Sequence, residues 1–270
     1  MNFFHKKPAV IIAHSVAYYI LSYIIILIFF QAITVLTAQY FDIPSIVHYN
    51  KMEFLVSTQS WTFDSVKMIF SSGSILALLI GLICLVVFIK AMSLEGMLKL
   101  FFFWGFVHGL NMFVGSMVLG AFLYEGMGYV YTWMYLQDTA KMFLLFAGLV
   151  ILIGTGTLMV RPMLLTVNSY YSSSKAEMRT AFKREQFYYP YLISTIILIL
   201  LRLPLSIYEL LLIITPGFIL LPLFSSLHRF TIFFFDEKER TVKLNMKLIV
   251  TTISLLIVFR ILWGFGIRIG

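Results

Sequence analysis

The chain has 270 residues, of which 61% are hydrophobic and 12% are charged, and its mean hydropathy is +0.96. Soluble domains carry about 25% charged residues, so this composition excludes a water-soluble globule and predicts one integral membrane domain over residues 1–270. The net charge of +8 does not indicate nucleic-acid binding, because the basic residues cluster at the ends of apolar segments, where they contact lipid headgroups.

Long apolar stretches predict an all-α polytopic bundle of about seven transmembrane helices, since one crossing takes about 20 residues. The predicted spans are 9–38, 68–89, 100–123, 142–160, 188–203, 206–227 and 248–266. Lys6 and Lys7 precede the first span, as basic residues precede the core of a signal peptide. The apolar run behind them is much longer than the roughly 7–15 residues of such a core, so we expect an uncleaved first helix.

Residues 188–227 form a run of forty residues with only two charges, Arg202 and Glu209. The run is too long for one crossing, and proline disfavours helical geometry at the residue before it. A break at Pro204 predicts two spans, whereas a break at Pro216 predicts one span and a re-entrant or kinked segment. Both arrangements remain open, with Pro204 the preferred break.

Lysine and arginine residues predict the orientation of the bundle. Fourteen of the twenty lie in the amino-terminal segment and in segments 90–99, 161–187 and 228–247, whereas segments 39–67 and 124–141 hold three. The positive-inside rule therefore predicts a cytoplasmic amino terminus. Seven spans then place the carboxyl terminus outside.

The third predicted span combines a stripe of small residues with two polar ones. The stripe consists of Gly105, Gly109, Ser116 and Gly120. Small residues at this spacing let a neighbouring helix approach closely, so we expect a packing face. His108 and Asn111 lie one turn apart on the adjacent face and need partners inside the bundle. We expect a hydrogen-bonded pair that fixes helix register, with a polar cavity or a metal site as alternatives.

Six polar residues inside apolar segments are candidates for a functional site: His14, His108, Asn111, Arg202, Glu209 and Arg260. Intramembrane ionisable groups pair with one another or mark a solute path. We expect an ion pair between Arg202 and Glu209 across the break, with Arg260 as an alternative partner for Glu209. A role of Glu209 in substrate or proton coupling is the other hypothesis. The five histidines show no paired spacing, so no metal ligand is predicted.

The segment from Tyr124 to Gln137 is rich in aromatic residues and is expected at the outer interface. Its candidate interface residues are Tyr129, Tyr131, Trp133 and Tyr135. We expect a half-helix on the outer leaflet, with a docking surface for a partner as the alternative.

Catalysis has little support, because HExxH, the Walker loop and GxGxxG are all absent from the sequence. No catalytic residue and no cofactor is predicted. The leading hypothesis is a non-enzymatic subunit of a bacterial cytoplasmic membrane, which scaffolds other membrane proteins through its basic loops and its aromatic outer loop. The alternative is a small-solute or proton-coupled carrier with a polar cavity around His108, Asn111 and Glu209. An intramembrane hydrolase of unfamiliar type is a weaker third hypothesis.

Overall fold

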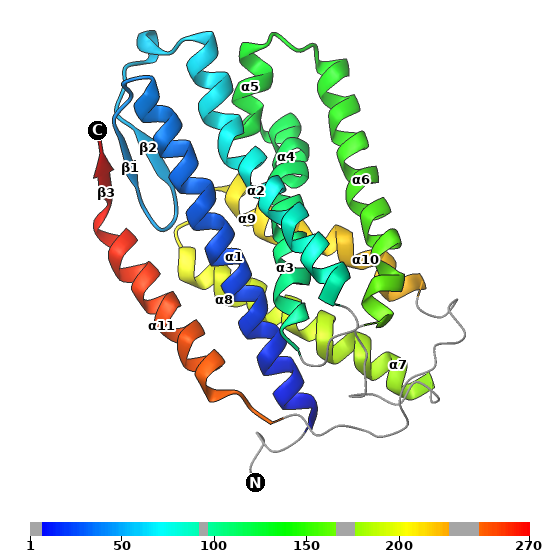
Figure 1. Cartoon of the computed structure of the whole chain (residues 1–270). Helices are drawn as coiled ribbons and strands as arrows, with labels where there is room; N and C mark the ends of the chain where they lie inside the picture. The colour runs from blue at the N-terminus through cyan, green and yellow to red at the C-terminus, as the bar shows by residue number, and fades with distance from the viewer. Residues whose placement is uncertain (1–6, 92–96, 166–175, 227–242) are drawn as a thin grey trace.

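The computed structural model describes residues 7–91, 97–165, 176–226 and 243–270 (Figure 1). Five helices of this part are long and apolar enough to cross a membrane, which makes the chain an all-α integral membrane protein in contact with lipid. They are α1 (Lys7–Tyr40), α2 (Phe63–Ala91), a composite helix over Lys99–Leu123, α6 (Asp138–Leu165) and α11 (Met246–Leu262). The composite helix runs as α3 (Lys99–Leu110), a π-helical turn (Asn111–Gly115) and α4 (Ser116–Leu123).

The run 188–227 contains two breaks, whereas we expected one. Its helices are α8 (Tyr189–Arg202), α9 (Ile207–Ile214) and α10 (Pro216–Ser226), and α7 (Ala176–Lys183) with a π-helical turn (Arg184–Tyr188) precedes them. Helical residues run without a gap from α7 through this turn to the end of α8, so the predicted helix over 188–203 is the carboxyl-terminal part of a longer one. The prediction of one continuous helix over 206–227 is wrong, because a turn at Thr215 separates α9 from α10. Pro204 and Pro216 each end a helix.

A three-stranded sheet, which the sequence did not predict, joins the carboxyl terminus to the first connecting segment. Its strands are β1 (Ser45–Val47), β2 (Met52–Phe54) and β3 (Ile267–Ile269), in the order β2-β1-β3 with antiparallel pairing. The 3-10 turns Thr58–Ser60 and Trp263–Phe265 flank it. Figure 1 shows the sheet, the carboxyl terminus and α5 (Met127–Trp133) at the end of the bundle opposite the amino terminus. We call this end of the bundle the sheet end.

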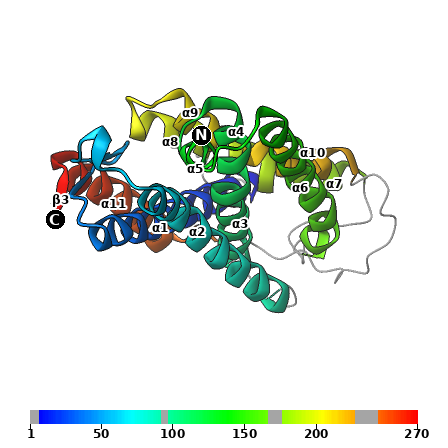
Figure 2. The same cartoon turned by 90° about the horizontal axis from the view of Figure 1, so that it is seen from above.

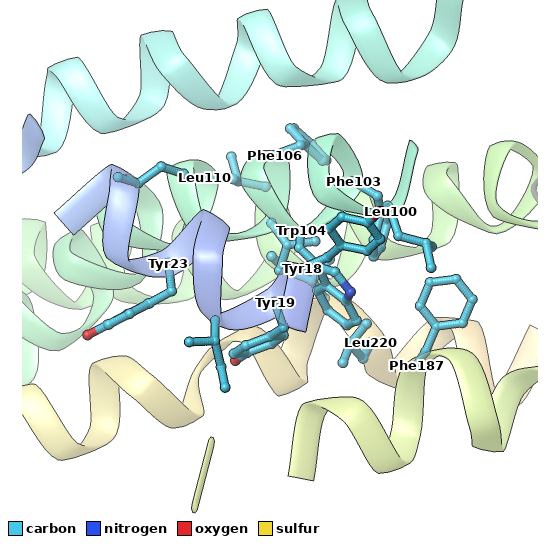
Figure 3. Packing of buried hydrophobic residues seen from close by; sticks show 14 of the residues in the cluster. Tyr18, Tyr19, Tyr23, Leu100, Phe103, Trp104, Phe106, Leu110, Phe187 and Leu220 are labelled. Carbon is cyan, nitrogen blue, oxygen red and sulfur yellow. The ribbon is translucent and has the colours of Figure 1, made fainter. Parts of the chain in front are cut away.

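The helices α1, α2 and α3 pack side by side, and α10 packs on α6 at the other edge (Figures 1 and 2). Aromatic side chains fill the core between α1, α3 and the segment before α8 (Figure 3). The Tyr19 and Trp104 ring centroids lie 4.8 Å apart, and those of Phe103 and Phe187 lie 5.3 Å apart. Edge-on pairs at this spacing are favourable beyond their burial, so the first pair fixes α1 against α3 and the second fixes α3 against the π-helical turn before α8.

The small-residue stripe of the composite helix faces two neighbouring elements. Gly109 packs on Gly81 of α2 so closely that a Cβ on Gly81 would lie 3.0 Å from the Cα of Gly109. The hydroxyl oxygens of Ser116 and Ser74 are 3.2 Å apart. Gly105 faces Cys84 of α2, and Gly120 faces the backbone at the start of α5. The stripe therefore brings α2 and α5 into close contact with the composite helix.

Candidate functional site

A cavity of about 340 Å³ opens among α1, α2, α5, α9 and the β1–β2 hairpin. We call it the sheet-end cavity. It extends from the hairpin down to Met112 and Leu212, which lie within the composite helix and α9. Polar and charged residues from separate chain segments line it: Gln31, Thr34, Asn50, Lys51, Ser74, Glu125, Arg202, Ser206, Tyr208 and Glu209.

Arg202 forms one wall of this cavity and is only 4% exposed. Its Nη2 lies 3.1 Å from Oε1 of Glu209 and 3.0 Å from the Asn50 carbonyl. Its Nη1 donates to the Tyr23 hydroxyl at 2.7 Å, and its Nε donates to the Tyr49 carbonyl at 3.1 Å. The expected contact between Arg202 and Glu209 is thus present in a larger network, which joins α1, the hairpin, α8 and α9.

The break between α8 and α9 is held by the same hairpin. Asn50 Nδ2 donates to the Pro204 carbonyl at 2.8 Å, and the Tyr49 hydroxyl donates to the Leu203 carbonyl at 3.1 Å. Ser206 caps α9 by accepting the Glu209 N–H at 3.2 Å. Backbone groups that a helix would have paired are therefore satisfied from outside it.

Asn111 stabilises the second break. Pro216 has no N–H, so the Leu212 carbonyl four residues earlier lacks its usual helical donor. Asn111 Nδ2 donates to this carbonyl at 2.8 Å, and the Thr215 hydroxyl donates to it at 3.0 Å. The π-helical turn that begins at Asn111 also places Met112 in the cavity wall. Such turns are frequent at functional sites.

His108 and Arg260 lie apart from the sheet-end cavity, in aromatic surroundings. The His108 ring centroid is 4.4 Å from that of Tyr19 and 5.3 Å from that of Tyr23, edge to face. The Arg260 guanidinium lies over the Tyr49 ring, 3.5 Å from its centroid. The structure does not bring these two residues to Glu209.

His14 makes a third, separate contact near the amino-terminal end. Its Nε2 accepts the Asn245 N–H at 2.8 Å, which joins α1 to the start of α11. Its Nδ1 is 3.3 Å from the Met97 sulfur. Of the six polar candidates, therefore, only Arg202 and Glu209 line the cavity, and the other described candidates join elements elsewhere.

Two residues of the cavity escaped the sequence analysis. Gln31 is 4% exposed; its Nε2 donates to the His48 carbonyl at 3.3 Å, and its Oε1 has no hydrogen-bond partner among the described residues. Glu125 lines the cavity, and no described residue forms a hydrogen bond or ion pair with its carboxylate. An amide in the middle of predicted span 9–38 was the available signal for Gln31.

The aromatic outer segment is divided between the interior and the surface. Tyr131 is buried, and its hydroxyl donates to the Met117 carbonyl at 3.5 Å. Burial raises the pKa of Tyr131 to about 12. The Tyr129 ring packs 4.8 Å from Phe70 and lines the cavity. Trp133 is half-buried, while Tyr135 is 88% exposed. The segment thus closes one side of the cavity as well as forming a surface.

The described residues contain no group of three or more His, Cys, Asp or Glu side chains that could hold a metal ion. No protein-family model, curated protein or solved structure matches this chain. The sheet-end cavity is therefore the feature from which function is inferred.

Proposed function

We propose that this chain is a non-enzymatic membrane carrier that takes up a small polar solute in the sheet-end cavity. One observation supports the proposal above the others: charged and polar groups from α1, the hairpin, the turn before α5 and α9 converge on one space of about 340 Å³. Ligand sites typically measure about 300–1,000 Å³ and combine apolar walls with a few convergent polar groups.

The broken helices next to the cavity support a carrier over a passive structural protein. Non-helical backbone at membrane depth is tolerated where it is buried in protein or lines a water-filled space. Pro204 and Ser206, which lie between α8 and α9, line the cavity, and Leu212 lies one turn before the next break. Interrupted helices of this kind form the substrate sites of many transporters.

The proposal includes an orientation. With the amino terminus cytoplasmic, the sheet end faces the outside of a bacterial cytoplasmic membrane and the cavity is loaded from there. The bias of lysine and arginine residues supports this orientation. The pairing of β3 with β1 supports it further, because it places the carboxyl terminus beside segment 39–67, as an odd number of spans requires.

Cysteine labelling from the outer side tests the proposal. Both variants are made in a Cys84→Ala background, which removes the native thiol. Leu212→Cys places a thiol in the cavity. Leu79→Cys is the control, because Leu79 is 51% exposed on the outer face of α2. A charged, membrane-impermeant methanethiosulfonate needs water and a thiolate. We expect it to label Leu212→Cys and to leave Leu79→Cys unlabelled. Equal absence of labelling at both positions would contradict an open cavity.

A scaffolding role is the second candidate, favoured by an exposed apolar surface at the sheet end. Phe122, Met134 and Tyr135 are 64%, 47% and 88% exposed. The basic segment 228–247, the other predicted contact, lies mostly outside the described residues. A mild-detergent pull-down tests this role: a stoichiometric partner that is lost on Tyr135→Ala would favour the scaffold, and recovery of the chain alone would oppose it.

A further inference from the structure

The charged residues around the sheet-end cavity differ in whether they have ion-pair partners. Arg202 is committed to Glu209 and to three oxygens of the protein. Lys51 forms an ion pair with Glu53, and this ammonium holds the pKa of Glu53 below its usual value. Glu125 has no such counter-charge among the described residues. Glu125 is therefore the one carboxylate of the lining without an ion-pair partner among the described residues.

The hydrogen-bonding groups of the lining indicate the same residue. Gln31 lines the cavity but does not offer it a polar atom: its Nε2 donates to the His48 carbonyl, and its Oε1, which has no hydrogen-bond partner among the described residues, is fully buried and out of reach of a solute. Glu125 is therefore the group of the lining that would accept N–H groups from a bound ligand.

Aromatic rings form much of the remaining wall, including those of Tyr23, Phe70, Tyr129 and Tyr208. The faces of such rings attract cations, and the attraction grows when the cation is shielded from water. An anion would meet the opposite conditions, because four of the five N–H groups of Arg202, the one guanidinium in the wall, already donate to protein oxygens.

We infer that the sheet-end cavity takes a small organic cation with N–H groups, a protonated primary or secondary amine. The inference rests on the proposed function and adds the class of solute. The ammonium group binds at the Glu125 carboxylate, and its carbon skeleton lies against the aromatic rings.

Calorimetric titration of the purified full-length chain with three probes of similar size tests the inference. The probes are 2-phenylethylammonium, neutral 2-phenylethanol and anionic 3-phenylpropanoate. We expect the amine to bind at least about tenfold more tightly than the alcohol, because charge-assisted hydrogen bonds are the stronger ones. The carboxylate should bind more weakly than either.

Variants identify the source of the preference. Glu125→Gln should remove the advantage of the amine over the alcohol, whereas Asp138→Asn, which changes an exposed carboxylate paired with Lys141, should keep it.

Equal affinity for the amine and the alcohol would overturn the inference and leave solute binding intact. Binding by none of the three at millimolar concentration would also overturn it. Labelling of Leu212→Cys then shows whether the cavity itself is open, so failure of the solute class is distinguished from failure of the proposed function.

Discussion

The side-chain amide of Asn111 replaces a hydrogen-bond donor that Pro216 lacks: its Nδ2 lies 2.8 Å from the Leu212 carbonyl oxygen. A second pair follows the same rule. Pro190 cannot supply the α-helical donor, four residues on, to the Gln186 carbonyl, and the Ser15 hydroxyl donates to this carbonyl at 2.7 Å. Polar residues inside apolar helices thus compensate for prolines in another segment, which lets a broken chain remain buried.

Asn111→Leu should destabilise the protein by about 1–3 kcal/mol, because it removes a donor from a buried carbonyl. Pro216→Ala restores the missing N–H, so Asn111→Leu should be less harmful in that background. Thermal unfolding in detergent of the wild type, the two single variants and the double variant measures the coupling free energy between the two residues. Additive effects of the two changes would show that the two residues do not compensate each other.

Ser15→Ala should lower the melting temperature, since Ser15 donates to Gln186 and accepts the Trp104 indole N–H at 3.1 Å. Both partners lie in a buried region, and the expected loss is about 1–3 kcal/mol. Ser22→Ala is the matched control: Ser22 is equally buried on α1, but its hydroxyl donates only to the Tyr19 carbonyl of its own helix. Similar losses for both would contradict this account.

Arg202→Met should be more damaging than Glu209→Gln. Removing the guanidinium leaves the Glu209 carboxylate and two carbonyls of the hairpin without their donor, and breaking a buried pair in this way costs about 3–5 kcal/mol. Glutamine at 209 keeps an acceptor for the guanidinium, so its effect should be smaller. The melting temperatures of the two variants decide the order, and the reverse order would contradict the network described above.

Gly109→Ala should destabilise the contact between α2 and α3, because an added Cβ would meet the backbone at Ala77 and Gly81. Gly154→Ala, inside α6, meets nothing within 4 Å and should be neutral or stabilising, since alanine is the better helix former. Unfolding measurements compare the two. Tolerance of alanine at Gly109 would show that the close approach is not required.

The sequence predicted the long helices well because about 20 apolar residues in a row admit few other structures. It also predicted the contact between Arg202 and Glu209 and a break at Pro204. It offered Pro216 only as an alternative to Pro204 and did not predict that both breaks occur, because a buried proline needs a donor from elsewhere, and Asn111 is distant in sequence from Leu212. The pairing of β3 with β1 likewise joins strands from opposite ends of the chain.

The sequence did not predict the sheet-end cavity for a related reason. Gln31 and Glu125 belong to segments far apart in the chain, and only the packed bundle brings them to one space. His108, in contrast, had a pattern that suggested a polar site, but aromatic rings of α1 enclose it. Polarity within a span therefore indicated that a partner exists without indicating which one.

The most direct test of the account compares cationic and anionic methanethiosulfonates on Leu212→Cys, applied from the outer side in the Cys84→Ala background. We predict labelling, with a cation-to-anion rate ratio above that of a free thiol, and a fall of this ratio on Glu125→Gln. Labelling by neither reagent would contradict an open sheet-end cavity, and a ratio equal to that of the free thiol would contradict its selection of cations.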